Sequence, residues 1–538
     1  MQSQRSSAAR AFCAAALVAL ATLAAGMAVA GAAVHYTYVP IYIPASRPAG
    51  PPPLDNKPGS AFVRCDGLPA HQTPAELAAR IVVIMATAGL SGPGEMADAR
   101  KRAHGDDGVA ACVEALATEA DPIRRVQLTL GEAAHQIEAG HFDAALTSAA
   151  SVDALAGPRA GETAYRRGLR LSGLELQAAA LVRLGRPEDA AKVALEMAGD
   201  EPWDVTVQGR AARFVDLSDD DGPERKAFFA HYGRLEPGAL TDRARAQEWH
   251  GDWRGAAESL EGLIDVYRGF ALAKPGPQPA LRAKAALDRA LAGDLAASED
   301  LAAATRAELQ DEIDSGLALS NQNVVAEATE LLDLRQVVIS LESGLTAQAR
   351  TAFAARSLWL AAGPGVMAAL TDRLRAGADV AQRTGALASD GATVRAEARR
   401  RAVAAMTSTG DPTKAEPWLW SAIRGYLTDD FYKSWDHGVW KTDKSPFLAK
   451  KTGKQTVAGD FLFVGPSNGP PAGEALLMHA ALLARARGEP GFVIFPRRQY
   501  ANGAWVRFGK SGDPGLPSVA WQDASEVISA LSDRFPGR

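Results

Sequence analysis

The chain has 538 residues, a mass of 56.4 kDa and a formal net charge of −5. With 47% hydrophobic and 22% charged residues, its composition is that of a globular protein of several domains, which excludes a mostly disordered chain. The near-neutral charge gives no general attraction for nucleic acid. Three cysteines exclude both a disulfide-dense scaffold and a zinc-cluster protein.

The amino-terminal segment, residues 1–34, carries the features of an export signal. Arg5 and Arg10 precede residues 11–34, which contain no charged side chain. Two interpretations stay open. Residues 28–30 (Ala-Val-Ala) have the pattern of a cleavage site, as in a removable signal peptide. The apolar run also exceeds the roughly 20 residues that span a bilayer, and tyrosines follow it directly, as in an uncleaved membrane anchor. Both interpretations put the rest of the chain in the periplasm or cell envelope.

A proline-rich linker follows over residues 35–59, and we expect it to be an extended spacer. Because Cys13 belongs to the amino-terminal segment, Cys65 and Cys112 are the two cysteines left for the exported part. In an oxidising compartment they predict one disulfide, and the alternative is two unrelated buried thiols.

Residues 60–408 are predicted to form a helical array. Thr73-Pro74-Ala75-Glu76 is a typical helix start, with a capping hydroxyl, a proline at the first helical position and a reciprocal glutamate. Segments rich in Ala, Leu, Glu and Arg follow with helical periodicity. They are separated by breaks such as Gly157-Pro158 and Gly222-Pro223, and almost no alternating strand pattern occurs among them.

A degenerate motif recurs at the turns of this array. It has a glycine, a ring two positions later and an alanine five positions later. Glycine ends the first helix in the left-handed conformation, the ring packs over the corner, and alanine lets the second helix approach closely. The three copies are Gly140, Phe142 and Ala145; Gly185, Pro187 and Ala190; and Gly251, Trp253 and Ala256. A weaker copy contains Gly344 and Ala349.

On these residues the chain resembles the tetratricopeptide repeat (TPR) family, over residues 120–270 and more weakly towards residue 360. The three glycines lie 45 and 66 residues apart, whereas repeats of the family are about 34 residues long. The resemblance therefore implies an irregular α-solenoid with insertions, whose groove binds a protein or peptide partner. The candidate groove residues are Arg166, Arg167, Arg210, Arg213 and Trp249.

Residues 409–538 are predicted to form a small mixed α/β (α+β) domain, so that the whole chain is mainly α. Strand-like runs occur at residues 461–464, 492–495 and 504–508, with helices expected at residues 474–487 and 525–535.

Three functions remain open from the sequence. The first is an envelope scaffold or adaptor that binds its partner in the TPR-like groove. The second is an envelope enzyme with Asp436, His437 and the loop around Ser467 as candidate catalytic residues. The third is a structural spacer without a ligand. The sequence leaves the oligomeric state and the partner's identity open.

No cofactor or metal is expected. His135, Glu138 and His141 are residue types that bind metals, but the two histidines are six positions apart and do not share a helix face. We interpret both as surface residues of a repeat.

Overall fold

The computed structural model describes residues 59–70, 97–270, 278–315, 322–407, 417–425, 429–440, 460–463, 470–496 and 503–537. The chain divides into two compact units, residues 1–56 and 57–538, and all described residues belong to the second unit. The predicted export segment, nearly all of the spacer and the helix start at Thr73 lie outside the described residues. None of the described helices is both long enough and apolar enough to cross a membrane.

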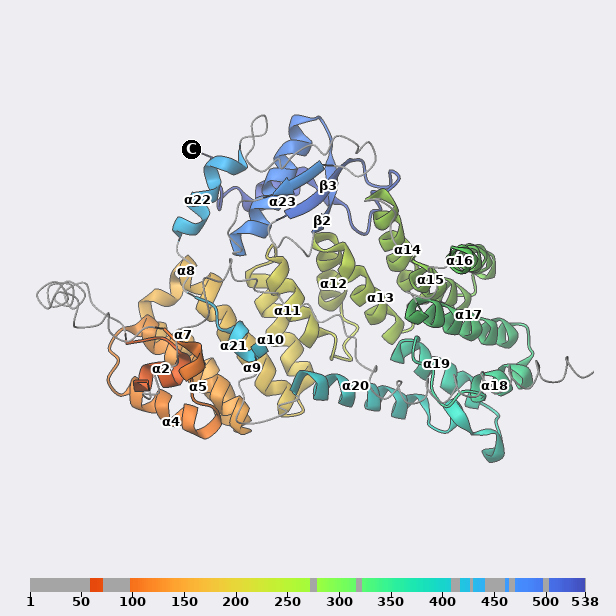
Figure 1. Cartoon of the computed structure of the whole chain (residues 1–538), viewed down its shortest axis with the longest axis horizontal. Helices are drawn as coiled ribbons and strands as arrows, with labels where there is room; N and C mark the ends of the chain where they lie inside the picture. The colour runs from red at the N-terminus through yellow and green to blue at the C-terminus, as the bar shows by residue number, and fades with distance from the viewer. Residues whose placement is uncertain are drawn as a thin grey trace, which may run out of the picture. The chain divides into compact units, whose positions relative to one another are not determined.

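The described chain is mainly helical, as the sequence predicts (Figure 1). A short helix, α2 (Ala61–Asp66), precedes the array. The helices of the array are α4 (Gly105–Leu116), α5 (Pro122–Ala139), α6 (Phe142–Ala150), α7 (Val152–Ala156), α8 (Thr163–Tyr165), α9 (Leu171–Arg183), α10 (Pro187–Asp200), α11 (Val205–Val215), α12 (Pro223–Leu235), α13 (Leu240–Trp249), α14 (Trp253–Gly269), α15 (Pro279–Leu291), α16 (Leu295–Asp314), α17 (Gln322–Glu342), α18 (Thr346–Ala354), α19 (Pro364–Arg375) and α20 (Gly391–Thr407). Most of these helices pack against the next one along the chain.

The turn motif forms helical hairpins at each predicted position. Gly140, Gly185 and Gly251 follow the ends of α5, α9 and α13, with φ angles of 84°, 72° and 78°. These positive angles favour glycine because it has no Cβ to clash with the backbone. The residues five positions later are completely buried, as close packing of the two helices requires: Ala145, Ala190 and Ala256. The weaker copy behaves in the same way, since Gly344 has a φ of 78° and Ala349 is completely buried.

A fifth hairpin turn was not predicted. Gly293, with a φ of 80°, joins α15 to α16. Ser298 stands in the place of the alanine and is completely buried. Its hydroxyl donates a hydrogen bond to the carbonyl oxygen of Ala286 (2.7 Å), so that a polar side chain is tolerated at this contact.

Extra elements account for the irregular spacing of the motif. Between Gly140 and Gly185 the chain inserts α7, α8 and a π-helical turn, η3 (Arg166–Arg170). Between Gly185 and Gly251 it adds the hairpin of α11 and α12, whose connection lacks the motif. These elements lengthen the two intervals between the glycines, while the TPR-like arrangement with insertions stays a prediction.

After α19 the chain returns along the array. Helix α19 packs on α13, α20 reaches α9, and a further helix, α21 (Pro417–Ala422), packs on α5 and α9 (Figure 1). The approach of α19 to α13 is very close, because a Cβ at Gly365 would lie 2.5 Å from the backbone oxygen of Glu248. Helix α21 lies within residues 409–538, the predicted carboxy-terminal domain, and it packs on α5 and α9 of the array.

The carboxy-terminal part contains a small antiparallel sheet in the strand order β1-β3-β2-β4. Its elements are α22 (Asp429–Val439), β1 (Asp460–Phe463), α23 (Pro470–Ala486), β2 (Gly491–Pro496), β3 (Gly503–Gly509), β4 (Gln522–Asp523) and α24 (Ala524–Leu531). The three predicted strands and the two predicted helices are confirmed. Strand β4 was missed because two residues are too few to show an alternating pattern.

The sheet is apolar on both faces because it lies between two helical layers. Phe492 and Ile494 of β2 pack in a cluster with α23. Val493 packs in another cluster, with Leu263 of α14 and the adjacent Phe270. Successive side chains of a strand point to opposite faces, so a strand buried on both sides reads as one continuous apolar run.

Candidate functional site

Helix α21 lies against α5 and α9 of the array (Figure 1). Its Leu419 and Ala422 are completely buried. A helix of six residues is not stable by itself in water, so its conformation depends on the surface that holds it. The side chains that contact this segment form a surface that we call the α21 groove, and its members are Arg102, His135, Glu138, Ser172, Arg183 and Arg210.

Trp420 makes the most specific contacts in the α21 groove. Its indole Nε1 donates a hydrogen bond of 2.8 Å to Glu138 Oε1. The ring of His135 meets the indole edge to face at a centroid distance of 4.8 Å, and the guanidinium of Arg102 lies 3.7 Å from the ring centroid. The groove therefore recognises both the polar edge and the π face of this side chain.

Glu138 is a buried carboxylate, 4% exposed. Its Oε2 accepts a hydrogen bond from the backbone N–H of Gly105 (3.3 Å) and lies 3.1 Å from His135 Nδ1. Burial by itself raises the pKa of Glu138, but the hydrogen bonds from His135 and Trp420 outweigh it, so that the pKa is lowered overall. The carboxylate is thus held in its charged form, as an acceptor for N–H donors.

Local sequence on α5 positions this carboxylate. Asp121 caps the helix, since its side chain accepts a hydrogen bond from the N–H of Arg124 (2.8 Å), and Pro122 occupies the first turn. His135 and Glu138 are three residues apart and therefore share one face of the helix.

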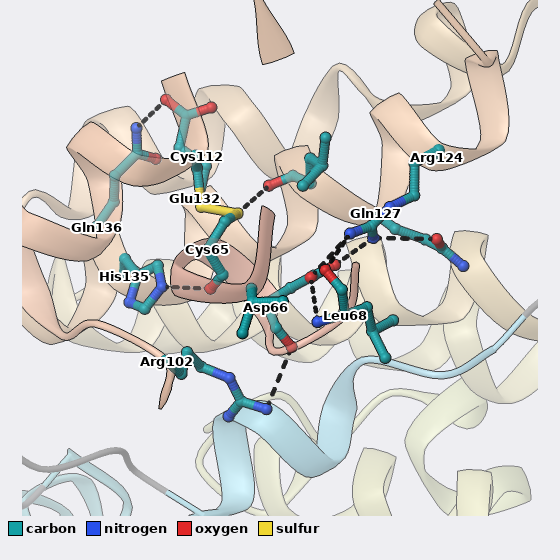
Figure 2. The surroundings of a disulfide bond; sticks show 12 residues. Cys65, Asp66, Leu68, Arg102, Cys112, Arg124, Gln127, Glu132, His135 and Gln136 are labelled. Atoms are coloured by element: carbon teal, nitrogen blue, oxygen red, sulfur yellow. Dashed lines mark hydrogen bonds and ion pairs between the residues drawn. A yellow bond between two sulfur atoms is a disulfide. The ribbon is translucent and has the colours of Figure 1, made fainter. Parts of the chain in front are cut away.

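A disulfide fixes the surroundings of His135. Cys65 on α2 and Cys112 on α4, which the sequence pairs, are joined with an S–S distance of 2.08 Å (Figure 2). The carbonyl oxygen of Cys65 lies 2.7 Å from His135 Nε2. Figure 2 marks this contact with a dashed line. Since Asp66 also pairs with Arg124, helix α2 is anchored to α5 at two points. The disulfide therefore supports the α21 groove through α2 and His135.

The other side of the groove comes from α9 and α11. Ser172 Oγ accepts a hydrogen bond of 2.7 Å from the backbone N–H of Arg424. Arg210 pairs with the buried Glu175 (2.9 Å) and also donates to Ser421 Oγ at 3.4 Å. The guanidinium of Arg183 lies 5.4 Å from the ring centroid of Trp418. Contacts thus reach the side chains and the main chain of the segment.

An open cleft of about 410 Å³ adjoins the α21 groove. Its lining residues come from α5, α6, α9 and α20 and from the turn at Gly140: Ile137, Glu138, Ala139, Gly140, Phe142, Arg183 and Val403. Glu138 and Arg183 belong both to this cleft and to the surface that holds α21. The cleft therefore continues the α21 groove beyond the residues that α21 covers.

The structure separates the five candidate groove residues. Arg210 alone belongs to the α21 groove. Trp249 donates from Nε1 to Asp219 (2.9 Å), and Arg399 of α20 lies 5.9 Å from its ring. Arg167 lies 4.1 Å from the ring of Tyr432 on α22.

Arg210, Trp249 and Arg167 thus contact the segment that returns along the array, each at a different place. Arg166 is exposed. Arg213 is half-buried, and this burial lowers the pKa of its guanidinium.

The prediction that His135 lies on the surface is wrong. Its side chain is completely inaccessible because Cys65 and Trp420, which are distant in the sequence, cover it. Glu138 was likewise not recognised as a site residue. His141 is exposed as predicted, and its Nε2 lies 2.8 Å from Asp106 Oδ1. A histidine and a glutamate three apart on one face were the available signal, but such pairs are also common on exposed helices.

The candidate catalytic residues do not form a described site. Asp436 is 6% exposed, and its Oδ1 accepts a hydrogen bond from the backbone N–H of Gly537 (3.0 Å), which anchors the end of the chain. The side chain of His437 and the whole of Ser467 lie outside the described residues. Within the described ranges, no three His, Cys, Asp or Glu side chains are grouped so that they could hold a metal ion.

Comparison of this chain with protein-family models, with curated proteins and with solved structures found no match. The function must therefore be inferred from the residues of the chain itself.

A second buried polar cluster lies between α13 and α15. Glu248 and Asp288 are both completely buried, and the ammonium of Lys284 lies 2.9 Å from Glu248 Oε1. Burial, followed by the charge of Glu248, raises the pKa of Asp288 well above its usual value. One lysine cannot neutralise two carboxylates, so the folded state favours the protonated form of Asp288.

This proton makes stability depend on pH. The unfolded chain releases the Asp288 proton above about pH 4, whereas the folded chain holds it to a higher pH. The contribution of Asp288 to the free energy of unfolding is therefore full below about pH 4 and is lost as the pH rises through the raised pKa. Asp288→Asn, which cannot ionise, should match the wild type at about pH 4 and exceed it increasingly towards pH 8. Each pKa unit of the shift corresponds to about 1.4 kcal/mol. Urea unfolding between pH 4 and 8 measures this, with the exposed Asp311→Asn as control. Parallel curves for both variants and the wild type would contradict the assignment.

Proposed function

We propose that this chain is an exported cell-envelope scaffold or adaptor that binds a peptide segment of a protein partner in the α21 groove. The observation that carries the proposal is the way in which α21 is held. A buried leucine side chain, two indole rings contacted by cations, and a backbone N–H bound by Ser172 are contacts that peptide-binding grooves use.

Two features of the chain support this proposal. The repeated glycine turns and the packing of successive helices fit an irregular TPR-like α-solenoid, an architecture that offers extended binding surfaces. The positive flank and apolar run of residues 1–34 fit export to the periplasm, with membrane attachment if the segment is uncleaved. Binding is favoured over catalysis because Asp436, the described member of the candidate catalytic set, is engaged in a structural hydrogen bond.

Affinity capture from envelope extracts tests the proposal, with the purified full chain as bait. The groove variant is Arg183→Glu, which places a negative charge beside Glu138 at the edge of the cleft. The matched control is Arg400→Glu on α20, where the arginine side chain is 71% exposed. We expect the wild type and the control to capture a protein partner in stoichiometric amount. Arg183→Glu should capture at least ~10-fold less of this partner, because the loss of one hot-spot contact lowers the affinity by about this factor.

Circular dichroism melts of the three baits provide the folding control. Equal recovery of every bound protein by folded Arg183→Glu and by the wild type would contradict the proposal, since such proteins would not depend on the groove.

A further inference from the structure

Helix α21 fills the part of the binding surface that offers the most specific contacts. Glu138, the buried acceptor of the groove, is already engaged by Trp420, and Arg102 covers the face of the same ring. A partner segment that used these groups would have to remove the indole first. The adjoining cleft of about 410 Å³, in contrast, is open.

The contacts also define the chemistry that the groove accepts. Trp418, Leu419 and Trp420 are consecutive, with the leucine completely buried and the two rings each contacted by an arginine. The buried carboxylate requires an N–H donor, which an indole supplies and a phenyl ring does not. The fixed acceptor thus selects a tryptophan at the position of Trp420, and the two cations favour aromatic rings on both sides of an aliphatic residue, as in Trp418-Leu419-Trp420.

We propose that α21 is an internal competing ligand of this groove, and that the partner binds through a one-turn helical segment of the same chemistry, tryptophan–aliphatic–tryptophan. This inference rests on the proposed function and adds its regulation. A tethered segment competes at an effective concentration that reaches the millimolar range, so a partner must bind tightly or be locally concentrated. The apparent affinity for the partner is lowered by the fraction of molecules in which α21 is in place.

Peptide binding to the full chain tests this inference. The probe is a fluorescein-labelled peptide of residues 414–425, KAEPWLWSAIRG, followed by fluorescence anisotropy. The control peptide has alanine at both tryptophan positions. The proteins are the wild type, the double variant Trp418→Ala/Trp420→Ala, and the double variant with Arg183→Glu added.

We expect the double variant to bind the probe at least ~10-fold more tightly than the wild type, because its own segment no longer competes. Adding Arg183→Glu should reverse this gain, and the control peptide should bind none of the three proteins measurably. Equal affinity of the wild type and the double variant would overturn the inference, as would absence of binding to a double variant whose circular dichroism melt shows a folded chain.

A milder variant keeps the test decisive if the double variant does not fold. Trp420→Phe retains an aromatic ring but removes the N–H that Glu138 accepts, and it should bind the probe at least ~3-fold more tightly than the wild type. No gain with this variant would also overturn the inference.

Size measurement separates an internal ligand from exchange between two copies. Light scattering should give the same oligomeric state for the wild type and for the double variant. The contrary result is a dimer that the wild type forms and the double variant does not. Such a dimer would mean that α21 of one copy occupies the groove of another, which contradicts an internal ligand.

The two proposals can fail separately. If the capture of a partner depends on Arg183 but the probe does not displace that partner, only the present inference fails. If the probe binds but no envelope protein depends on Arg183, the proposed function fails.

Discussion

Lys284→Met is expected to destabilise the chain by about 3–5 kcal/mol, the usual cost of leaving a buried charge without its partner. Lys284 is the cation that faces the completely buried Glu248 at 2.9 Å, and Asp288 lies in the same cluster. Burial lowers the pKa of Lys284, but its pairing with the charged Glu248 counters this effect, and the pKa of Lys284 is raised overall. The lysine is therefore charged at neutral pH, and methionine replaces its bulk without its charge.

Urea unfolding at pH 7 measures this effect. The matched control is Lys192→Met on α10, where the side chain is 78% exposed and lies 3.8 Å from Asp189. An exposed pair contributes about 0–1 kcal/mol, so the control should unfold close to the wild type. Adding Glu248→Gln to Lys284→Met should recover part of the loss, because the uncompensated charge is then absent. Identical midpoints for Lys284→Met and Lys192→Met would show that the pair does not stabilise the fold.

Removal of the disulfide, by Cys65→Ala with Cys112→Ala, is expected to cost about 4 kcal/mol. This value follows from the chain-entropy model for a sequence separation of 47 residues. The loss should also reach the α21 groove, because α2 supplies the Cys65 carbonyl oxygen that contacts His135 (Figure 2). His135 in turn contacts both Glu138 and Trp420.

Two measurements check the disulfide prediction. Urea unfolding of the full chain gives the stability, with Cys13→Ala as the control that leaves the pair intact. Hydrogen exchange of residues 417–422 reports on the groove and should rise in the double variant before global unfolding. If the free energy of unfolding falls but hydrogen exchange of residues 417–422 is unchanged, the disulfide does not support the α21 groove, and the proposed link through His135 is wrong.

The hairpin turns could be predicted because their signals are local. Gly140, Gly185 and Gly251 need positive φ angles, and the alanine five positions later is required wherever two helices cross closely. The Gly293 turn was missed since Ser298 differs from the alanine of the other copies, although its hydroxyl is satisfied by Ala286. Small size, rather than alanine itself, is the property that this position requires.

The α21 groove could not be predicted, because its contacts join residues that are far apart in the sequence. Trp420 and Glu138 are separated by 282 positions, and Arg424 and Ser172 by 252. No periodicity links such residues. The same reason explains why three of the candidate groove residues, Arg167, Arg210 and Trp249, contact the returning segment of the chain itself.

Local signals in the sequence predict the mainly helical class, the hairpin turns and the strands of the small sheet, and the cysteine count favours a pair of Cys65 with Cys112. Each of these depends on neighbouring residues or on a count of cysteines. The return of the chain along the array, the burial of His135 and Glu138, and the packing of α21 on α5 and α9 had to be seen in the folded chain. These features come from packing between distant segments, and burial and satisfied polar groups become visible only when those segments meet.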